Sequence, residues 1–146
     1  MKSYVLLLSL FCISTSGLAQ DLDREFKMGA GKRIEFDLRT GGKLTINGTE
    51  SDVVRVKVKQ RATGDDRDAN IEFDEVASGL RISSSMPKYS RGYSTSLRFE
   101  LSVPHKTNLE IESAGGAISI DGVEGDISGR TMGGELVLTN LQGQID

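Results

Sequence analysis

The stretch that decides the fold is GGAISIDGVEGDI at residues 115–127, which returns 18 residues later as GGELVLTNLQGQI at residues 133–145. Glycine aligns with glycine three times across this offset. Apolar positions also align, namely Ile118, Ile120, Val123 and Ile127 with Leu136, Leu138, Leu141 and Ile145. A fixed period with apolar residues in register is typical of repeat architectures. We therefore predict a Gly-rich β-solenoid over residues 105–146, with an 18-residue repeat, two short strands per turn and glycine at the corners.

Upstream of these repeats, residues 20–104 alternate between apolar and polar side chains with a period of two. Residues 33–39, RIEFDLR, show the strict alternation of a half-buried strand. The same pattern predicts strands at 44–46, 54–59, 71–74, 80–82, 97–103 and 109–112. The dipeptides Gly41-Gly42 and Asn47-Gly48 are typical of turns between strands. We predict an all-β fold in which alternating antiparallel strands over 20–104 continue into the solenoid as one domain.

Residues 41–48, GGKLTING, resemble the opening of the two later repeats. Two interpretations are open: a diverged copy of the repeat, or simply another strand that follows a glycine pair. We favour the second interpretation, because only the opening of the segment matches.

The first 19 residues have the features of a cleaved signal peptide. Lys2 is followed by a mostly apolar run at 4–13 and by small residues that end at Ala19. This run is shorter than the roughly 18–20 apolar residues of a membrane anchor. We therefore expect export to the periplasm, cell surface or extracellular space, with no transmembrane span after cleavage. Cys12 is the only cysteine, so the mature chain would fold without disulfides.

The composition argues against several classes of site. The chain has 18 Lys and Arg against 21 Asp and Glu, a net charge of −3, which gives no reason to expect nucleic acid as a partner. One histidine and one cysteine exclude a zinc site built from those residues. The sequence has no Gly-x-Ser-x-Gly motif for a nucleophile. We predict no catalytic, cofactor-binding or metal-binding residues and no cofactor, so the protein is expected not to be an enzyme.

Two segments are candidates for contact with a partner. Lys88, Tyr89, Arg91 and Tyr93 lie in a Ser-rich loop at 83–96, and Tyr, Ser, Gly and Arg are typical of adaptable contact surfaces. A basic stripe, defined as Arg55, Lys57, Lys59 and Arg61, follows one face of the strand at 54–59. We interpret the stripe as pairing with Glu72 and Asp74 on a neighbouring strand, since opposite charges across a ladder are favourable. The alternative is that it holds an anionic glycan or phosphate.

The run Leu101-Ser102-Val103-Pro104, then residues 107–111, TNLEI, and then the two Gly-Gly repeats resemble the DUF4097 family of bacterial adhesin-like proteins. The GIN adhesin-head domains are similar in style. The resemblance implies a β-solenoid or β-helix-like domain in the bacterial envelope and transfers no catalytic or binding residue. Because such domains continue through further Gly-Gly repeats, two hypotheses follow: this chain is a piece of a longer protein, or the open end of its last repeat docks on another molecule.

Three functions are open from the sequence. The first is an exported, non-enzymatic envelope or cell-surface β-solenoid protein that acts as an adhesin or binding module, with a surface glycan or envelope protein as its partner. The second is a structural or regulatory envelope protein that acts through a protein partner. The third is a polysaccharide-active β-helix enzyme, which would need a larger acidic cluster than Asp121 and Asp126 provide. We favour the first; the sequence names no ligand.

Overall fold

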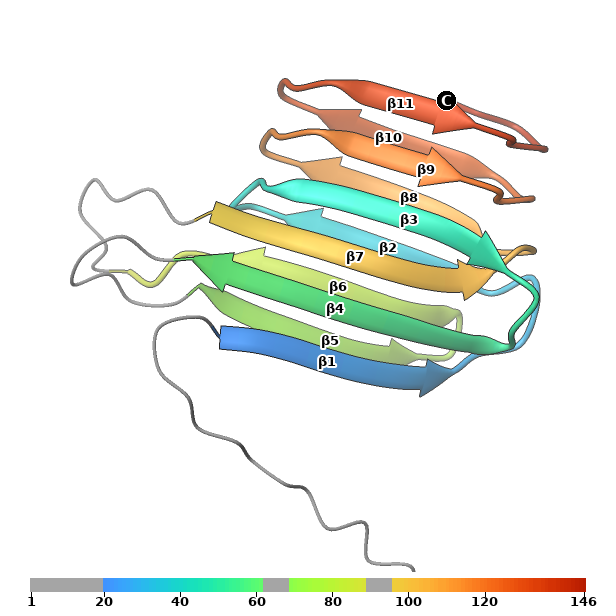
Figure 1. Ribbon diagram of the computed structural model, residues 1–146, viewed down its shortest axis with the longest axis horizontal. Helices are drawn as coiled ribbons and strands as arrows, with labels where there is room; N and C mark the ends of the chain where they lie inside the picture. The colour runs from blue at the N-terminus through green and yellow to red at the C-terminus, as the bar shows by residue number, and fades with distance from the viewer. Residues whose placement is uncertain (1–19, 62–68, 89–95) are drawn as a thin grey trace, which may run out of the picture.

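The computed structural model describes residues 20–61, 69–88 and 96–146 (Figure 1). Within these residues the chain is all-β without a helix, which confirms the predicted class. The strands are β1 (Gln20–Lys27), β2 (Arg33–Leu38), β3 (Lys43–Thr49), β4 (Val53–Arg61), β5 (Asn70–Val76), β6 (Gly79–Ser85), β7 (Ser96–Pro104), β8 (Asn108–Ser113), β9 (Ile118–Asp121), β10 (Ile127–Thr131) and β11 (Leu136–Thr139). The predicted signal peptide, residues 1–19, lies outside the described residues.

The strands form two sheets that pack face to face, as the two layers of Figure 1 show. The six-stranded sheet has the order β1-β4-β7-β3-β9-β11, and the five-stranded sheet has the order β10-β8-β2-β6-β5. From β6 onward the chain alternates between the sheets with every strand. Each connection therefore carries the chain across the core from one layer to the other.

Both sheets are mixed, which corrects the prediction that the N-terminal strands are antiparallel. β2 pairs parallel with β6 and β8, and β3 pairs parallel with β7 and β9. Antiparallel pairing is confined to β1 with β4, β4 with β7, and β5 with β6. Gly41 and Gly42 accordingly lead from one sheet to the other, and Asn47 and Gly48 lie inside β3 where the sequence suggested a turn. A dipeptide with turn chemistry is only a local preference, which the ladder on both sides of β3 overrides.

The parallel register joins the segments that the sequence aligned. Leu136 lies opposite Ile118 in β11 and β9, and Ile127 lies opposite Leu109 in β10 and β8. Leu44 of β3 also lies opposite Ile118, so residues 41–48 occupy the same position in the sheet as the later Gly-led segments. Residues 41–48 do form a strand that follows a glycine pair, and their interpretation as a diverged copy of the repeat stays a hypothesis. The second short strand that we expected in the last turn is reduced, at residues 143–145, to one bridge between Ile127 and Ile145.

Three stacked glycines allow neighbouring backbones to approach closely at the start of these strands. Gly42, Gly116 and Gly134 have φ angles of 120°, 102° and 107°. A Cβ atom added to Gly116 would lie 2.1 Å from the Gly42 carbonyl oxygen, and one added to Gly134 would lie 2.1 Å from that of Gly116. Glycine is therefore required for both the conformation and the space.

The core lies between the two sheets and consists of the inward side chains of the alternating strands. Ile34, Leu44, Ile46 and Phe99 are among its fully buried members. Burial of apolar area at about 25 cal/mol per Å² makes this layer the main source of stability. The core is closed near β1 and β5 by partly buried side chains, including Phe26 and Phe73, whose ring centroids lie 5.7 Å apart.

The other end of the core, at β10 and β11, is open to solvent. Leu136, Leu138 and Ile145 are exposed by 56%, 37% and 47% of their surface. They continue the inward-facing rows of β8 and β9, because Leu136 follows Ile118 and Ile145 follows Ile127 in register. In the described structure, side chains thus cover the core at the β1 and β5 end, whereas apolar side chains are exposed at the β10 and β11 end.

Candidate functional site

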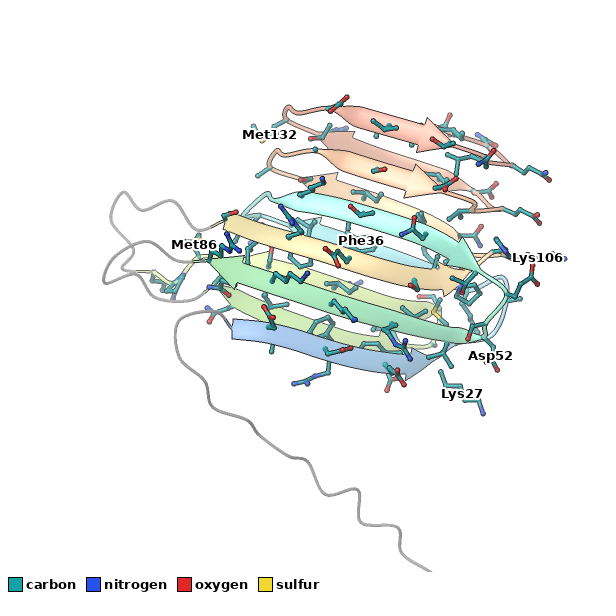
Figure 2. The ribbon with its side chains drawn as sticks, in the orientation of Figure 1. Lys27, Phe36, Asp52, Met86, Lys106 and Met132 are labelled. Carbon is teal, nitrogen blue, oxygen red and sulfur yellow. The ribbon has the colours of Figure 1, made fainter. Side chains whose placement is uncertain are left out.

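The outer face of β3, β4 and β7 carries most of the positive charge of the six-stranded sheet. The strict alternation of β4 buries Val54, Val56 and Val58 completely and turns the residues between them outward. Arg55, Lys57 and Lys59 are therefore exposed on one face. Figure 2 shows the described side chains of both layers on the ribbon. The same alternation buries Phe99 and Leu101 of β7 and turns Arg98 and Glu100 outward. Buried valines thus position the predicted basic stripe, on a strand that the sequence anticipated.

Two cations that sequence reasoning missed extend the stripe across the sheet. Lys59 lies opposite Arg98 in β7, and Arg98 lies opposite Lys43 in β3. Three cations on adjacent strands are unfavourable to the fold, because like charges directly opposite each other repel. No local pattern at Lys43 or Arg98 reveals this row, since each is simply the polar residue that alternation requires.

The acidic residues near the stripe come mainly from a strand that the sequence did not predict. Asp21, Asp23 and Glu25 of β1 lie opposite Lys59, Lys57 and Arg55, and Glu25 forms a salt bridge with Arg55. The predicted partners Glu72 and Asp74 are instead on β5, in the other sheet, so that pairing was wrong.

Within the described part of the chain, the other cations of this face do not form salt bridges with β1. Lys59 Nζ lies 3.7 Å from Glu100 Oε1. Among the residues that the structure describes, no carboxylate lies within salt-bridge distance of Lys43, Lys57 or Arg98. Glu100 is the single acidic residue on β3, β4 and β7. The excess positive charge is therefore concentrated away from the β1 edge.

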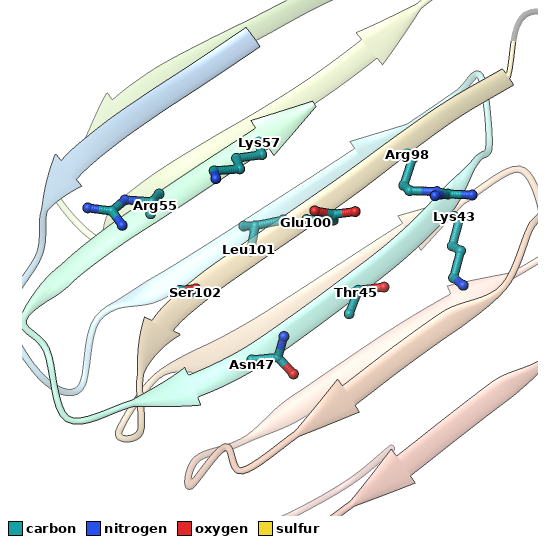
Figure 3. A pocket seen from close by; sticks show the side chains of 9 residues that line it. All are labelled: Lys43, Thr45, Asn47, Arg55, Lys57, Arg98, Glu100, Leu101 and Ser102. Atoms are coloured by element: carbon teal, nitrogen blue, oxygen red, sulfur yellow. The ribbon is translucent and has the colours of Figure 1, made fainter. Parts of the chain in front are cut away.

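These side chains surround a shallow polar hollow with a volume of about 340 Å³ (Figure 3). We define the cationic hollow by its lining residues, which are Lys43, Thr45, Asn47, Arg55, Lys57, Arg98, Glu100, Leu101 and Ser102. In Figure 3, Lys43 and Arg98 extend from neighbouring strands, whereas Arg55 and Lys57 extend from β4. Four cations and one carboxylate surround small polar residues, an arrangement suited to a ligand with repeated negative charges and hydroxyl groups.

Of the four predicted contact residues, Lys88 is described, and it is exposed shortly after the end of β6. Tyr89, Arg91 and Tyr93 lie outside the described residues, so the proposed role of the loop stays a prediction. The last residue of the basic stripe, Arg61, lies opposite Ser96, the first residue of β7.

The outer face of the five-stranded sheet has the opposite character. It carries Glu35, Asp37, Glu72, Asp74, Glu110 and Glu112 on β2, β5 and β8. Arg81 Nη2 lies 2.8 Å from Glu35 Oε2, and the hydrogen bond from Arg81 to this carboxylate raises the pKa of Arg81. Arg33 Nη1 lies 3.5 Å from Glu110 Oε2. Cations on this face have acidic neighbours, unlike Lys43 and Arg98.

The acidic residues considered for a polysaccharide-active enzyme do not converge. Asp121 ends β9 in the six-stranded sheet and accepts a hydrogen bond from Asn140 at 3.0 Å, while Asp126 precedes β10 in the other sheet. Over residues 20–61, 69–88 and 96–146, three or more metal-ligating side chains gather nowhere. The same residues contain no helix long and apolar enough to cross a bilayer.

The fold and this face define an all-β protein of two packed sheets with one cationic outer surface. Among solved structures, the chain is similar to one described as a putative cell adhesion protein from Clostridium sporogenes, with a TM-score of 0.56 and 16% sequence identity. The match covers 86% of this chain and 63% of that chain, so the present sequence spans less than two thirds of its neighbour. At this identity the similarity shows the fold alone. No family model and no curated protein matches the sequence.

Proposed function

We propose that this chain is an exported, non-enzymatic protein of the cell envelope or cell surface that acts as an adhesin-like binding module. The sequence pattern of residues 1–19 supports export. The fold similarity to a protein described as a putative cell adhesion protein supports a surface role. We further propose membership of the DUF4097 adhesin-like family, on the motifs at 101–104, 107–111 and the Gly-Gly segments.

The proposed architecture is a two-layered β-solenoid that antiparallel strands close at one end. Three observations support it: parallel pairing in both layers, alternation of the chain between the layers from β6 to β11, and the stacked glycines at the starts of β3, β9 and β11. In such a stack each turn buries the apolar face of the previous one, which gives a rigid, extended surface. A rigid surface suits binding, because little conformational entropy is lost when a ligand attaches.

The observation that carries the binding role is the cationic hollow. Lys43 and Arg98 lie side by side on a sheet without acidic partners among the described residues, at a cost in like-charge repulsion. A purely structural face would place opposite charges across the strands, as the five-stranded sheet does with Arg81 and Glu35. Lys43 and Arg98 are therefore available to a ligand.

Cell fractionation and surface proteolysis of the full chain carrying a C-terminal tag test this role. We expect the chain in the envelope fraction or medium, with a mass that corresponds to cleavage after Ala19, and accessible to protease added to intact cells. The purified protein should also bind isolated cell envelopes. Retention in the cytoplasm with residues 1–19 still attached would contradict the proposal, as would export without any binding to envelopes.

A second candidate, an envelope protein that acts through a protein partner, is favoured by a different observation. Leu136, Leu138 and Ile145 at the open end are exposed by 56%, 37% and 47%, and all three line one apolar hollow. Exposed apolar side chains that cluster on one surface are common at protein interfaces. Crosslinking in intact cells through a photoreactive residue at position 138, followed by mass spectrometry, would identify one reproducible protein partner if this candidate is correct.

A further inference from the structure

We infer that the cationic hollow binds a linear anionic polysaccharide, with Lys43 and Arg98 as its main contacts. This inference rests on the proposed binding function and adds the chemical class of the ligand. It names residues on two different strands, β3 and β7, that no single segment of sequence groups together.

The charge balance across the sheet indicates where the anion is held. On the β1 side, Glu25 already neutralises Arg55, and Asp21 lies opposite Lys59. Arg98 and Lys43 lie one and two strands farther from these acids. An incoming carboxylate or sulfate would therefore gain most at Arg98 and Lys43, where it displaces no existing ion pair. A charge-assisted hydrogen bond to a guanidinium is also among the stronger polar contacts available at a surface.

The uncharged lining of the hollow indicates a sugar polymer. Thr45, Asn47 and Ser102 offer hydroxyl and amide groups between the cations, and these can both donate to and accept from sugar hydroxyls. The aromatic residue of these strands, Phe99, is buried, so the outer face of β3, β4 and β7 has no ring on which a base could stack. The apolar residue that lines the hollow, Leu101, is buried, so the hollow itself offers no apolar side chain that would enter a lipid layer. These features favour a polysaccharide over single-stranded nucleic acid or a membrane surface.

Equilibrium binding of the full chain to defined polymers tests the ligand class. The probes are polygalacturonate for carboxylates, heparin for sulfates, dextran as a neutral polymer, a single-stranded oligonucleotide and anionic lipid vesicles. We expect binding to at least one acidic polysaccharide that weakens as salt is raised, because salt screens exposed charges, and no binding to dextran. Tighter binding to the oligonucleotide or the vesicles than to both acidic polysaccharides would overturn the inference.

A pair of matched double variants tests the location. Lys43→Gln with Arg98→Gln should weaken polysaccharide binding by about tenfold or more, since two charge-assisted contacts are lost. Lys106→Gln with Arg130→Gln removes the same charge from exposed positions outside the hollow, and binding should change by less than about twofold. Equal weakening by both variants would show attraction by net charge alone and would overturn the assignment.

The thermal midpoint separates a binding role from a structural one. Because Lys43 and Arg98 repel each other, the first variant should keep or slightly raise the midpoint while it loses ligand. A lowered midpoint with parallel loss of binding would overturn the inference, since the two residues would then be structural.

The two proposals can fail separately. If the full chain binds isolated envelopes but no acidic polysaccharide, the ligand class fails while the proposed function stands. If it binds neither, both fail.

Discussion

The glycine at position 116 sets the distance between two neighbouring strands. Gly116→Ala would place a Cβ atom 2.1 Å from a backbone oxygen and force alanine to a φ of 102°. We expect a loss of at least about 2–3 kcal/mol in the free energy of unfolding, measured in urea. Gly133→Ala is the control, because its Cβ would meet no atom within 4 Å and it is not among the positive-φ glycines. Similar losses for the two variants would contradict this account.

At the same scale, the sequence predicted which glycines are structural but not all of their partners. Gly116 and Gly134 could be paired from the repeat, and Asn140, with a φ of 50°, stands where the offset places Gly122. Asparagine tolerates this left-handed conformation better than most residues, so the replacement keeps the turn. The third member of the stack, Gly42, lies far away in the sequence, and only the sheet brings it next to Gly116.

Among the elements, β1 and β5 are edge strands of the two sheets, and together they close one end of the core. Each pairs antiparallel with its neighbour. Phe26 of β1 and Phe73 of β5 belong to different sheets, and their rings join the two layers. Phe26→Ala and Phe73→Ala should each destabilise the chain, and a double-mutant cycle should give a coupling of about 0.5–1.5 kcal/mol. Thermal or urea unfolding of the four proteins measures it. Additive losses would mean that the rings act independently.

The pairing of elements was harder to predict than their existence. β2, β4 and β7 follow from alternation, because buried and exposed positions differ plainly in chemistry. The partner of β4 does not, since both β1 and β5 offer acidic side chains at alternate positions. Choosing between them requires knowing which sheet each strand joins, which is a non-local property. The row from Lys59 through Arg98 to Lys43 depends on that choice and was missed for the same reason.

Across the whole molecule, segments distant in sequence interleave in space. β2 and β3 precede β6 and β7 in the chain, yet they lie between β6 and β8 in one sheet and between β7 and β9 in the other. β2 and β3 are thus hydrogen-bonded on both sides to later strands.

Ile46 is fully buried in β3, so shortening its side chain should affect the strands on both sides of β3. We expect Ile46→Ala to cost about 2–4 kcal/mol and to lower the single unfolding transition as a whole, measured by circular dichroism. Two separate transitions would argue against this interleaving.

The same topology predicts a gradient of stability along the stack, measurable by amide hydrogen exchange of the full chain. β3 and β7 have hydrogen-bonded neighbours on both sides and fully buried inward side chains, including Ile46 and Phe99. β11 pairs with β9 alone, and Leu136 and Leu138 are substantially exposed. Local opening of β11 therefore exposes little further apolar surface. Its amides should exchange through local opening whose free energy is well below the global free energy of unfolding. Amides of β3 and β7 should exchange only through global unfolding, so Ile46→Ala should accelerate them while leaving those of β11 nearly unchanged. Equal protection of β11 and β3 would require the exposed end to be as well packed as the centre, contrary to the described structure.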